Sequence, residues 1–339
     1  EPIAGVARAG EQVAGAIALL WGLGAPLDSA RAALDFARAC DLGMARACED
    51  AGNAYLVGVG VQRDPARGLA FLQRGCGGGD ARACEMMAVV YAFGQGVPAD
   101  PARARTLLED TCPRHGPRAC STLALLFVQG VGVPHDRDRA RHLFASACDA
   151  GDGFSCAMLG RALRKTAPAA ALARARRGCA LGDDRGCIVV GEAAREAGDD
   201  GAAVAAYQQA CDLAPSTGCG PLAAAYADGR GVARDHARAR DLYRTTCDGG
   251  DAHACEVLGA WARDGVEQAA APADALAMFQ EACRLMAPTG CDAAAALLSD
   301  GRALAADPTA AQALRARACE LGPTVCAQRA PRPRPRPAR

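Results

Sequence analysis

One arrangement of apolar and polar positions recurs along the chain. Counted from the second cysteine of a repeated pair, position +3 is apolar, position +4 is small and position +7 is usually large and apolar. One segment reads Met87, Ala88 and Tyr91 at these positions, and the next reads Leu123, Ala124 and Phe127. Positions three and four apart lie on the same face of an α-helix, so the pattern predicts a helix with one apolar face in each segment.

Capping residues predict where each helix ends and where a second helix begins. Glycine at position +10 supplies a left-handed C-cap, and aspartate at position +16 N-caps the next helix. The glycines are Gly58, Gly94, Gly130, Gly229, Gly265 and Gly301, and the aspartates are Asp64, Asp100, Asp136, Asp235 and Asp307. A large residue often stands four before the first cysteine of a pair, one helical turn away. Each unit is therefore predicted to be helix, short loop, helix.

The 18 cysteines place these units in a tandem array. They form nine pairs, of which eight have a separation of eight residues, and successive first cysteines are mostly 36 residues apart. The pairs are Cys40 with Cys48, Cys76 with Cys84, Cys112 with Cys120, Cys148 with Cys156, Cys179 with Cys187, Cys211 with Cys219, Cys247 with Cys255, Cys283 with Cys291, and Cys319 with Cys326, the last being seven apart. A fixed period of this length predicts an all-α, α/α solenoid of about nine helix-pair repeats.

Each pair spans the turn between two repeats. The first cysteine ends the second helix of a unit and its partner begins the first helix of the next, which is close enough for a disulfide. Reduced core thiols and metal ligands are the alternatives. Because every cysteine has a partner and the spacing matches no common zinc motif, we favour disulfides and an oxidising compartment, secreted or periplasmic.

The two ends of the chain differ from the array. Moving back 36 residues from Asp64 and Gly58 gives Asp28 and Gly22, so residues 1–27 are predicted to hold an N-terminal capping helix. The apolar stretch there resembles the core of a secretory signal, but it is too short to span a bilayer, and we expect no transmembrane segment. Since the chain begins at Glu1, we expect an export signal to have been removed. The tandem repeats then occupy 28–326, and residues 327–339, which alternate proline with arginine, are predicted to form a disordered tail.

These features resemble the Sel-one-like repeat family, relatives of tetratricopeptide repeats. The loops Gly94-Gln95-Gly96-Val97-Pro98 and Gly130-Val131-Gly132-Val133-Pro134, with the capping aspartate after them, carry the resemblance. The cysteine pairs make the chain most similar to the secreted cysteine-rich members first known from Helicobacter. The resemblance implies a right-handed superhelix that binds other molecules on its concave face. Some members have also been described as weak β-lactamases or penicillin binders.

Composition and motifs narrow the function. The chain has 38 basic and 38 acidic residues and 4% aromatic residues, so we expect no nucleic-acid partner. Neither Ser121 nor Ser216 has a lysine three residues on, as a serine β-lactamase requires. The five histidines are scattered, and the glycine loops lack the lysine of a phosphate-binding loop. We therefore expect no catalytic residue, no metal and no cofactor.

The concave face offers candidate binding residues. In superhelices of this kind the first helices line that face, where positions +1, +5 and +8 should point. Across three units the candidates are Glu85, Val89, Ser121, Leu125, Val128, Arg161 and Arg164. An apolar strip beside a basic one suits an extended peptide with an acidic end. Alternatively, Val89 and Leu125 pack against neighbouring repeats, and the arginines belong to a solvated helix end.

The sequence favours a non-catalytic scaffold. We expect a monomer that binds a protein, a peptide or a cell-wall fragment along the concave face. The alternative is a weak β-lactamase or a hydrolase of peptidoglycan-like amides, which rests on the family resemblance alone.

Overall fold

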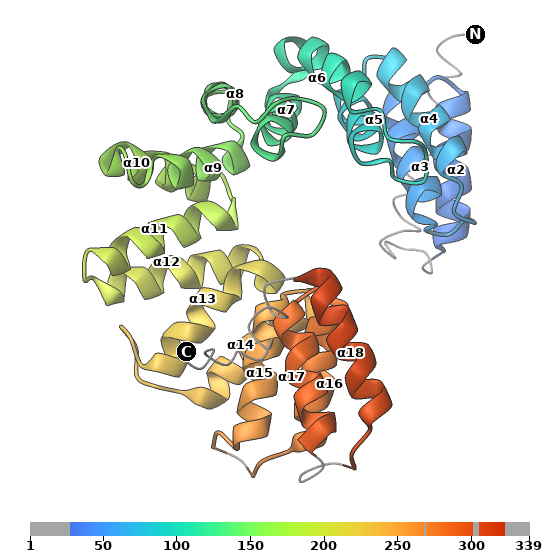
Figure 1. Cartoon of the computed structure of the whole chain (residues 1–339). Helices are drawn as coiled ribbons and strands as arrows, with labels where there is room; N and C mark the ends of the chain where they lie inside the picture. The colour runs from blue at the N-terminus through green and yellow to red at the C-terminus, as the bar shows by residue number, and fades with distance from the viewer. Residues whose placement is uncertain (1–27, 268, 301–304, 323–339) are drawn as a thin grey trace, which may run out of the picture. The chain divides into compact units, whose positions relative to one another are not determined.

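The structure is a computed structural model that describes residues 28–267, 269–300 and 305–322 (Figure 1). The secondary structure in these ranges is α-helical, in seventeen helices labelled α2 to α18. Their bounds are α2 Ser29–Asp41, α3 Ala45–Val57, α4 Pro65–Gly77, α5 Ala81–Phe93, α6 Pro101–His115, α7 Pro117–Gln129, α8 Arg137–Asp149, α9 Gly153–Leu163, α10 Pro168–Ala180, α11 Asp184–Glu196, α12 Asp200–Leu213, α13 Pro215–Asp228, α14 His236–Asp248, α15 Ala252–Asp264, α16 Pro272–Arg284, α17 Pro288–Asp300 and α18 Pro308–Leu321. The predicted capping helix in 1–27, Cys326 and the tail 327–339 lie outside the described residues.

Each helix packs mainly against its neighbours in the chain, as in a solenoid. The odd-numbered helices from α3 onward are the first helices of their repeats, and the even-numbered helices are the second. The chain divides into two compact units, residues 1–174 and 175–339. The predicted all-α helix-pair architecture is confirmed, whereas the right-handed sense of the superhelix stays a prediction.

The predicted apolar positions form the core of each repeat. Met87, Ala88 and Tyr91 of α5 are buried, as are Leu123 and Phe127 of α7. The large residue four before the first cysteine is buried in all seven second helices that carry one: Phe36, Leu72, Leu108, Phe144, Tyr207, Tyr243 and Phe279. Because one helix pair cannot cover its own apolar face, these side chains connect into clusters that cross from one repeat to the next.

The capping signals act as the sequence predicts. Asp64 accepts a hydrogen bond from the backbone N–H of Arg67, and Asp100 accepts one from Arg103, each at 3.0 Å. Gly58, Gly94, Gly130, Gly229 and Gly265 adopt the left-handed conformation at the ends of first helices. Aspartates also cap several first helices, for example Asp80 at α5 and Asp251 at α15. Local hydrogen bonds therefore define both ends of most helices.

A cation–π contact repeats beside these caps. The third residue of a second helix places its guanidinium over the aromatic ring at +7 of the preceding first helix, 4.4 to 4.6 Å from the ring centroid. The pairs are Arg67 over Tyr55, Arg103 over Tyr91, Arg139 over Phe127 and Arg238 over Tyr226. With an exposed guanidinium, a contact of this kind contributes about 0.5 to 1 kcal/mol and fixes the two helices of a repeat against each other.

The second glycine of the Gly-x-Gly loop allows neighbouring repeats to approach closely. Gly231 has φ +70°, and a Cβ added there would overlap the carbonyl group of Asp200 at the start of α12. Gly60 stands in the same relation to Ser29 at the start of α2. These glycines are needed both for the backbone conformation and for contact with the preceding second helix.

Disulfides join consecutive repeats at their turns. Eight of the nine pairs expected from the spacing are bonded, with Cα atoms 4.2 to 4.9 Å apart, and each links the end of a second helix to the start of the next first helix. The bonded pairs are Cys40–Cys48, Cys76–Cys84, Cys112–Cys120, Cys148–Cys156, Cys179–Cys187, Cys211–Cys219, Cys247–Cys255 and Cys283–Cys291. Cys319 of the ninth pair is also disulfide-bonded. Reduced core thiols and metal ligands, the two alternatives, do not describe these cysteines.

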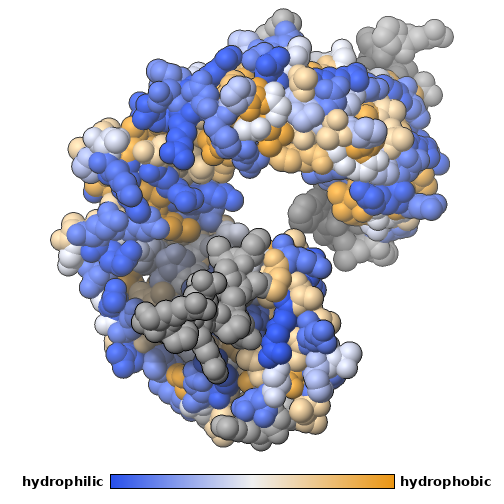
Figure 2. Space-filling model, viewed as in Figure 1, coloured by the Kyte–Doolittle hydropathy of each residue, from blue (hydrophilic) through white to orange (hydrophobic). Residues whose placement is uncertain are grey.

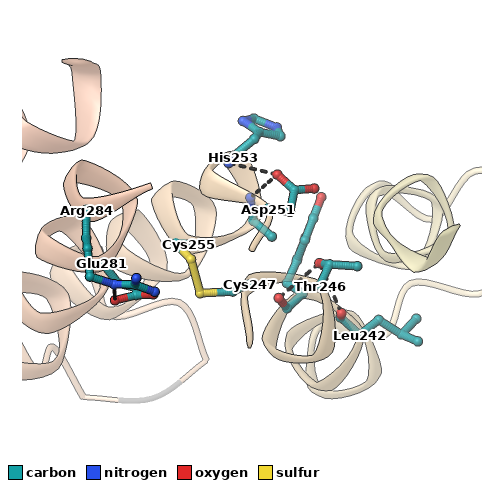
Figure 3. The surroundings of a disulfide bond; sticks show 10 residues. Leu242, Thr246, Cys247, Asp251, His253, Cys255, Glu281 and Arg284 are labelled. Atoms are coloured by element: carbon teal, nitrogen blue, oxygen red, sulfur yellow. Dashed lines mark hydrogen bonds and ion pairs between the residues drawn. A yellow bond between two sulfur atoms is a disulfide. The ribbon is translucent and has the colours of Figure 1, made fainter. Parts of the chain in front are cut away.

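The Cys247–Cys255 bridge shows how a turn between repeats is held (Figure 3). The Thr246 hydroxyl donates to backbone carbonyls of α14, and the Asp251 carboxylate accepts from the backbone N–H of His253. The bridge and the cap of α15 thus fix the same turn.

Two repeats lack the glycine loop. Residues 164–167 alone connect α9 to α10, and residues 197–199 connect α11 to α12, whereas residues 58–64 connect α3 to α4. These are the repeats whose cysteine steps are 31 and 32 residues. The shortened spacing therefore comes mainly from the connections, and α9, with 11 residues where α3, α5 and α7 have 13, accounts for the rest.

Replacing Gly231 with alanine tests the close approach of repeats. The Gly182→Ala variant is a matched control, because Gly182 has φ +85° but nothing lies within 4 Å of an added Cβ. Gly182→Ala should cost about 1 to 2 kcal/mol for the left-handed backbone alone. Gly231→Ala should cost about 1 to 3 kcal/mol more, because the methyl group overlaps α12. Urea unfolding followed by circular dichroism measures both, and equal losses would contradict the contact.

Removing one bridge tests what the disulfides contribute. In the chain-entropy model a closed loop of nine residues stabilises the fold by about 2.5 kcal/mol at most. The double variant that combines Cys148→Ala with Cys156→Ala should therefore lose up to about that free energy of unfolding while keeping its helical content. Peptide mapping without reduction should show the remaining bridges between nearest cysteines. Bridges between cysteines one repeat apart would contradict the assignment.

Candidate functional site

The first helices α3, α5 and α7 present one shared surface, here called the first-helix face. At 100° per residue, positions −2, +1, +5 and +9 from the second cysteine lie on one side of a helix. The face comprises Arg46, Glu49, Asn53 and Val57 of α3, then Arg82, Glu85, Val89 and Phe93 of α5, then Arg118, Ser121, Leu125 and Gln129 of α7. Position +8, which the sequence also predicts there, adds Val128.

The first-helix face is hollowed between α3 and α5. A cavity of about 420 Å³ is lined by Glu49, Asn53 and Val57 on one side and by Arg82, Glu85 and Val89 on the other. A second hollow of about 300 Å³ lies at the starts of α5 and α7, where Arg82, Glu85 and Arg118 take part in its lining. The two hollows share Arg82, Glu85 and Arg118, so they adjoin on one surface.

Three arginines form a row at the N-terminal ends of the helices. Arg46, Arg82 and Arg118 are exposed, and none of them makes a salt bridge within the ranges that the structure describes. Arg46 and Arg82 interact electrostatically with the carboxyls of Glu49 and Asp50, and the exposed guanidinium groups can also bind a carboxylate or phosphate from outside.

The carboxyl groups near this row of arginines are those of Glu49, Asp50 and Glu85, and their environments differ. Burial raises the pKa of the Glu49 carboxyl above its usual range, Asp50 raises it further, and Arg82 and Arg46 oppose the shift. Burial likewise raises the pKa of Asp50. Glu85 accepts a hydrogen bond of 3.0 Å from Thr122 of α7. Glu85 therefore bridges two repeats, whereas Glu49 is a desolvated acid at the edge of the cavity.

Apolar side chains are exposed at the C-terminal ends of the same helices. Val57 is 62% exposed, Phe93 51% and Val128 40%. Val89 is half-buried and lines the cavity, and Leu125 is half-buried and packs against the core cluster. The first-helix face thus has a basic edge, an apolar edge and a hollow between them.

The structure brings only some of the candidate binding residues predicted from the sequence to the cavity. Glu85 and Val89 lie together at the cavity. Ser121 is 6% exposed, and its hydroxyl donates to the backbone carbonyl of Arg118 at 2.8 Å, so it is occupied inside its own helix. Arg161 of α9 is exposed, whereas Arg164 is half-buried and has a partner.

Positions −2 and +9 carry residues that the sequence analysis missed. At the starts of first helices, the string Ala-Arg-Ala-Cys stands at residues 45–48 and 81–84, and Pro-Arg-Ala-Cys at 117–120. A helical wheel that included these two positions would have found both the arginine row and Phe93.

The visible surface shows hydrophilic residues over most of its area with hydrophobic groups between them (Figure 2).

Two other features, a metal-binding cluster and a membrane-spanning helix, are absent from the residues that the structure describes. No group of three or more histidine, cysteine, aspartate or glutamate side chains in these ranges is placed to hold a metal ion. None of the helices in the described part of the chain combines the length and apolar character needed to cross a membrane.

Comparison with known proteins agrees with the repeat pattern. The Sel1 repeat model matches residues 45–80, 81–109, 117–152 and 222–251. None of the curated proteins matches the chain in sequence.

Solved structures share the fold. A Sel1 repeat protein from Oxalobacter formigenes has 19% identity over 87% of this chain and 89% of its own, with a TM-score of 0.58. A protective antigen of uropathogenic Escherichia coli with an SLR fold has 21% identity over 92% and 69%, with a TM-score of 0.52. Yeast Tom70 has 11% identity over 95% and 67%, with a TM-score of 0.53. At these identities the likeness shows the fold alone.

The family match, the solved neighbours and the repeating helix pairs agree, and the disulfide pattern is consistent with the cysteine-rich members known from Helicobacter. The chain contains four segments that are Sel1 repeats, set in a tandem array of helix pairs.

Proposed function

We propose that this protein is a non-catalytic scaffold that binds an extended peptide segment, from a partner protein or from a cell-wall fragment, across its first-helix face. The observation that carries the proposal is the cavity between α3 and α5, which lies between arginines without salt bridges in the described ranges and exposed apolar side chains. Sel1 repeats generally mediate protein interactions, which supports the same class of function.

The two edges of the face define the ligand. A segment that crosses α3, α5 and α7 would place acidic groups against Arg82 and Arg118 and apolar groups against Phe93 and Val57. Val89 lies between these edges and offers a shallow apolar contact inside the cavity. Affinity would come mainly from the apolar edge, and the arginines would set orientation and the rate of association.

The compartment follows from the cysteines. Disulfides at every described junction between repeats indicate an oxidising environment. We propose that the protein acts as a monomer outside the cytoplasm, either secreted or in the periplasm, where peptide segments of other envelope proteins and of the cell wall are present.

The apolar edge is tested by Phe93→Glu. The probe is the set of linear peptides enriched on the wild-type chain from a phage-displayed random library. Burying a phenylalanine in a complex contributes about 1.5 to 3 kcal/mol, so the variant should bind these peptides at least about tenfold more weakly. Leu34→Glu is the matched control, because Leu34 is 46% exposed but lies on the second helix α2. Equal losses in the two variants would reject the assignment of the face.

The basic edge is tested by Arg82→Glu. An exposed charge acts through screened electrostatics, so reversal should weaken binding of the enriched peptides about threefold to tenfold at low ionic strength and less at high salt. Arg137→Glu, an exposed arginine at the start of α8, should leave affinity unchanged. Isothermal titration at two salt concentrations measures both. An affinity that ignores Arg82→Glu and falls when residues 332–339 are removed would move the binding element to the tail.

A further inference from the structure

The repeat formed by α15 and α16 differs at three positions from the four repeats that carry the arginine–aromatic pair. Position +7 is Ala262, where four other repeats have an aromatic ring, and the third residue of α16 is Asp274, where those repeats have the arginine that covers the ring. The second glycine of the loop is replaced by Glu267, which keeps a left-handed backbone with φ 55°. All three lie in or beside one pocket.

The first two changes leave space in the repeat. A pocket of about 340 Å³ opens between α14, α15 and α16, and Leu258, Trp261 and Met278 provide much of its apolar lining. Trp261 stands at position +6, where Ala54, Val90, Leu126 and Ala225 of other repeats are buried. Its indole is only partly buried, because Ala262 and Asp274 do not fill the neighbouring volume.

Several side chains hold Trp261 at the wall of this pocket. The indole packs edge-on against Tyr243 and His236, with ring centroids 5.6 and 5.3 Å away. His236 in turn contacts Glu267 through Nδ1 at 2.8 Å and the carbonyl of Ala227 through Nε2 at 3.1 Å. A non-glycine residue in the left-handed region is strained and persists where its surroundings fix it. We therefore attribute the presence of Glu267, where other repeats have glycine, to its contact with His236.

The residues that line this pocket carry more positive than negative charge. Arg240 and Arg244 lie one turn apart on α14 and line the pocket, opposite Asp274 of α16. Arg240 donates a hydrogen bond of 2.9 Å to the carbonyl of Val266, which directs its side chain across the loop. Arg244 is exposed and makes no salt bridge among the described residues. Asp274 lies in the first turn of α16, where the helix dipole stabilises its charge. The side chains of Arg240 and Arg244 thus face a single carboxylate, that of Asp274, whose charge the helix dipole already stabilises.

We propose that this Trp261 pocket binds a monoanionic apolar group about the size of one blocked amino acid. Its carboxylate pairs with Arg244 and Arg240, and its aromatic or aliphatic side chain lies against Trp261, Leu258 and Met278. A peptide C-terminus and a free N-acyl amino acid share this chemistry. The pocket uses positions +3, +6 and +7 of its first helix, so it is separate from the first-helix face and independent of the function proposed there.

Tryptophan fluorescence reports directly on this pocket. Trp21 is the chain's other tryptophan, so a Trp21→Phe background leaves Trp261 as the emitter. Titration with N-acetyl-L-phenylalanine should give a saturable change in emission, and the corresponding amide, which lacks the charge, should bind about tenfold more weakly. A peptide ending in phenylalanine and the same peptide as its C-terminal amide form the second arm. Binding of the free-acid peptide alone, without the acyl amino acid, would identify a peptide C-terminus as the source.

Two variants test the residues involved. Arg244→Gln should weaken binding of N-acetyl-L-phenylalanine about tenfold. Arg238→Gln, on the same helix but over the ring of Tyr226, should leave affinity unchanged. The double variant that combines Ala262→Phe with Asp274→Arg restores the pair found in other repeats, so it should fill the pocket, keep the fold and abolish binding.

Three results would overturn the proposal. They are equal binding of acids and amides, full affinity in Arg244→Gln, and no saturable response to either the acyl amino acid or the free-acid peptide. Circular dichroism of each variant separates a loss of binding from a loss of fold. If the filled variant does not fold, the comparison of Arg244→Gln with Arg238→Gln still decides the question.

Discussion

The junction between repeats is the constraint on which the rest of this structure depends. A helix pair of this size exposes an apolar face that only the next pair can cover, so each repeat is stable only in contact with its neighbours. A disulfide across the turn holds the second helix of one repeat against the first helix of the next. Gly231 and Gly60 permit the loops to approach the preceding repeat at the opposite ends of the same second helices. Covalent and steric constraints thus fix the relation of adjacent helices within each unit.

With the junctions fixed, the outward positions of the helices become free to vary. The first helices repeat at a constant offset, so the same position in successive repeats produces a row on the surface. Arg46, Arg82 and Arg118 make such a row, and Arg82 and Arg118 take part in lining the hollow between α3 and α5. A binding face built from rows can recognise an extended ligand, since successive repeats contribute contacts at a regular spacing.

The pairing of an aromatic residue with an arginine also distinguishes some repeats from others. An aromatic ring at +7 is accompanied by an arginine in the second helix in four repeats, whereas Ala262 is accompanied by Asp274. The two positions change together because the guanidinium has no partner without the ring. Trp261 fills only part of the space that the missing aromatic ring leaves, and a pocket therefore lies at that repeat.

The sequence by itself determined the elements of this protein and their order. Apolar periodicity, Asp64-type N-caps, glycine C-caps and cysteines eight apart all act over a turn or two of chain, so each is visible in a short window of sequence. The tertiary structure decided which outward residues share a surface. Ser121 matched the outward position but bonds within its own helix, while Arg82 and Phe93 entered the face from positions the sequence analysis did not consider. The physical reason is that a binding surface depends on the packing of helices about 36 residues apart, and small differences in side-chain volume, such as Ala262 in place of an aromatic ring, determine where that packing leaves space.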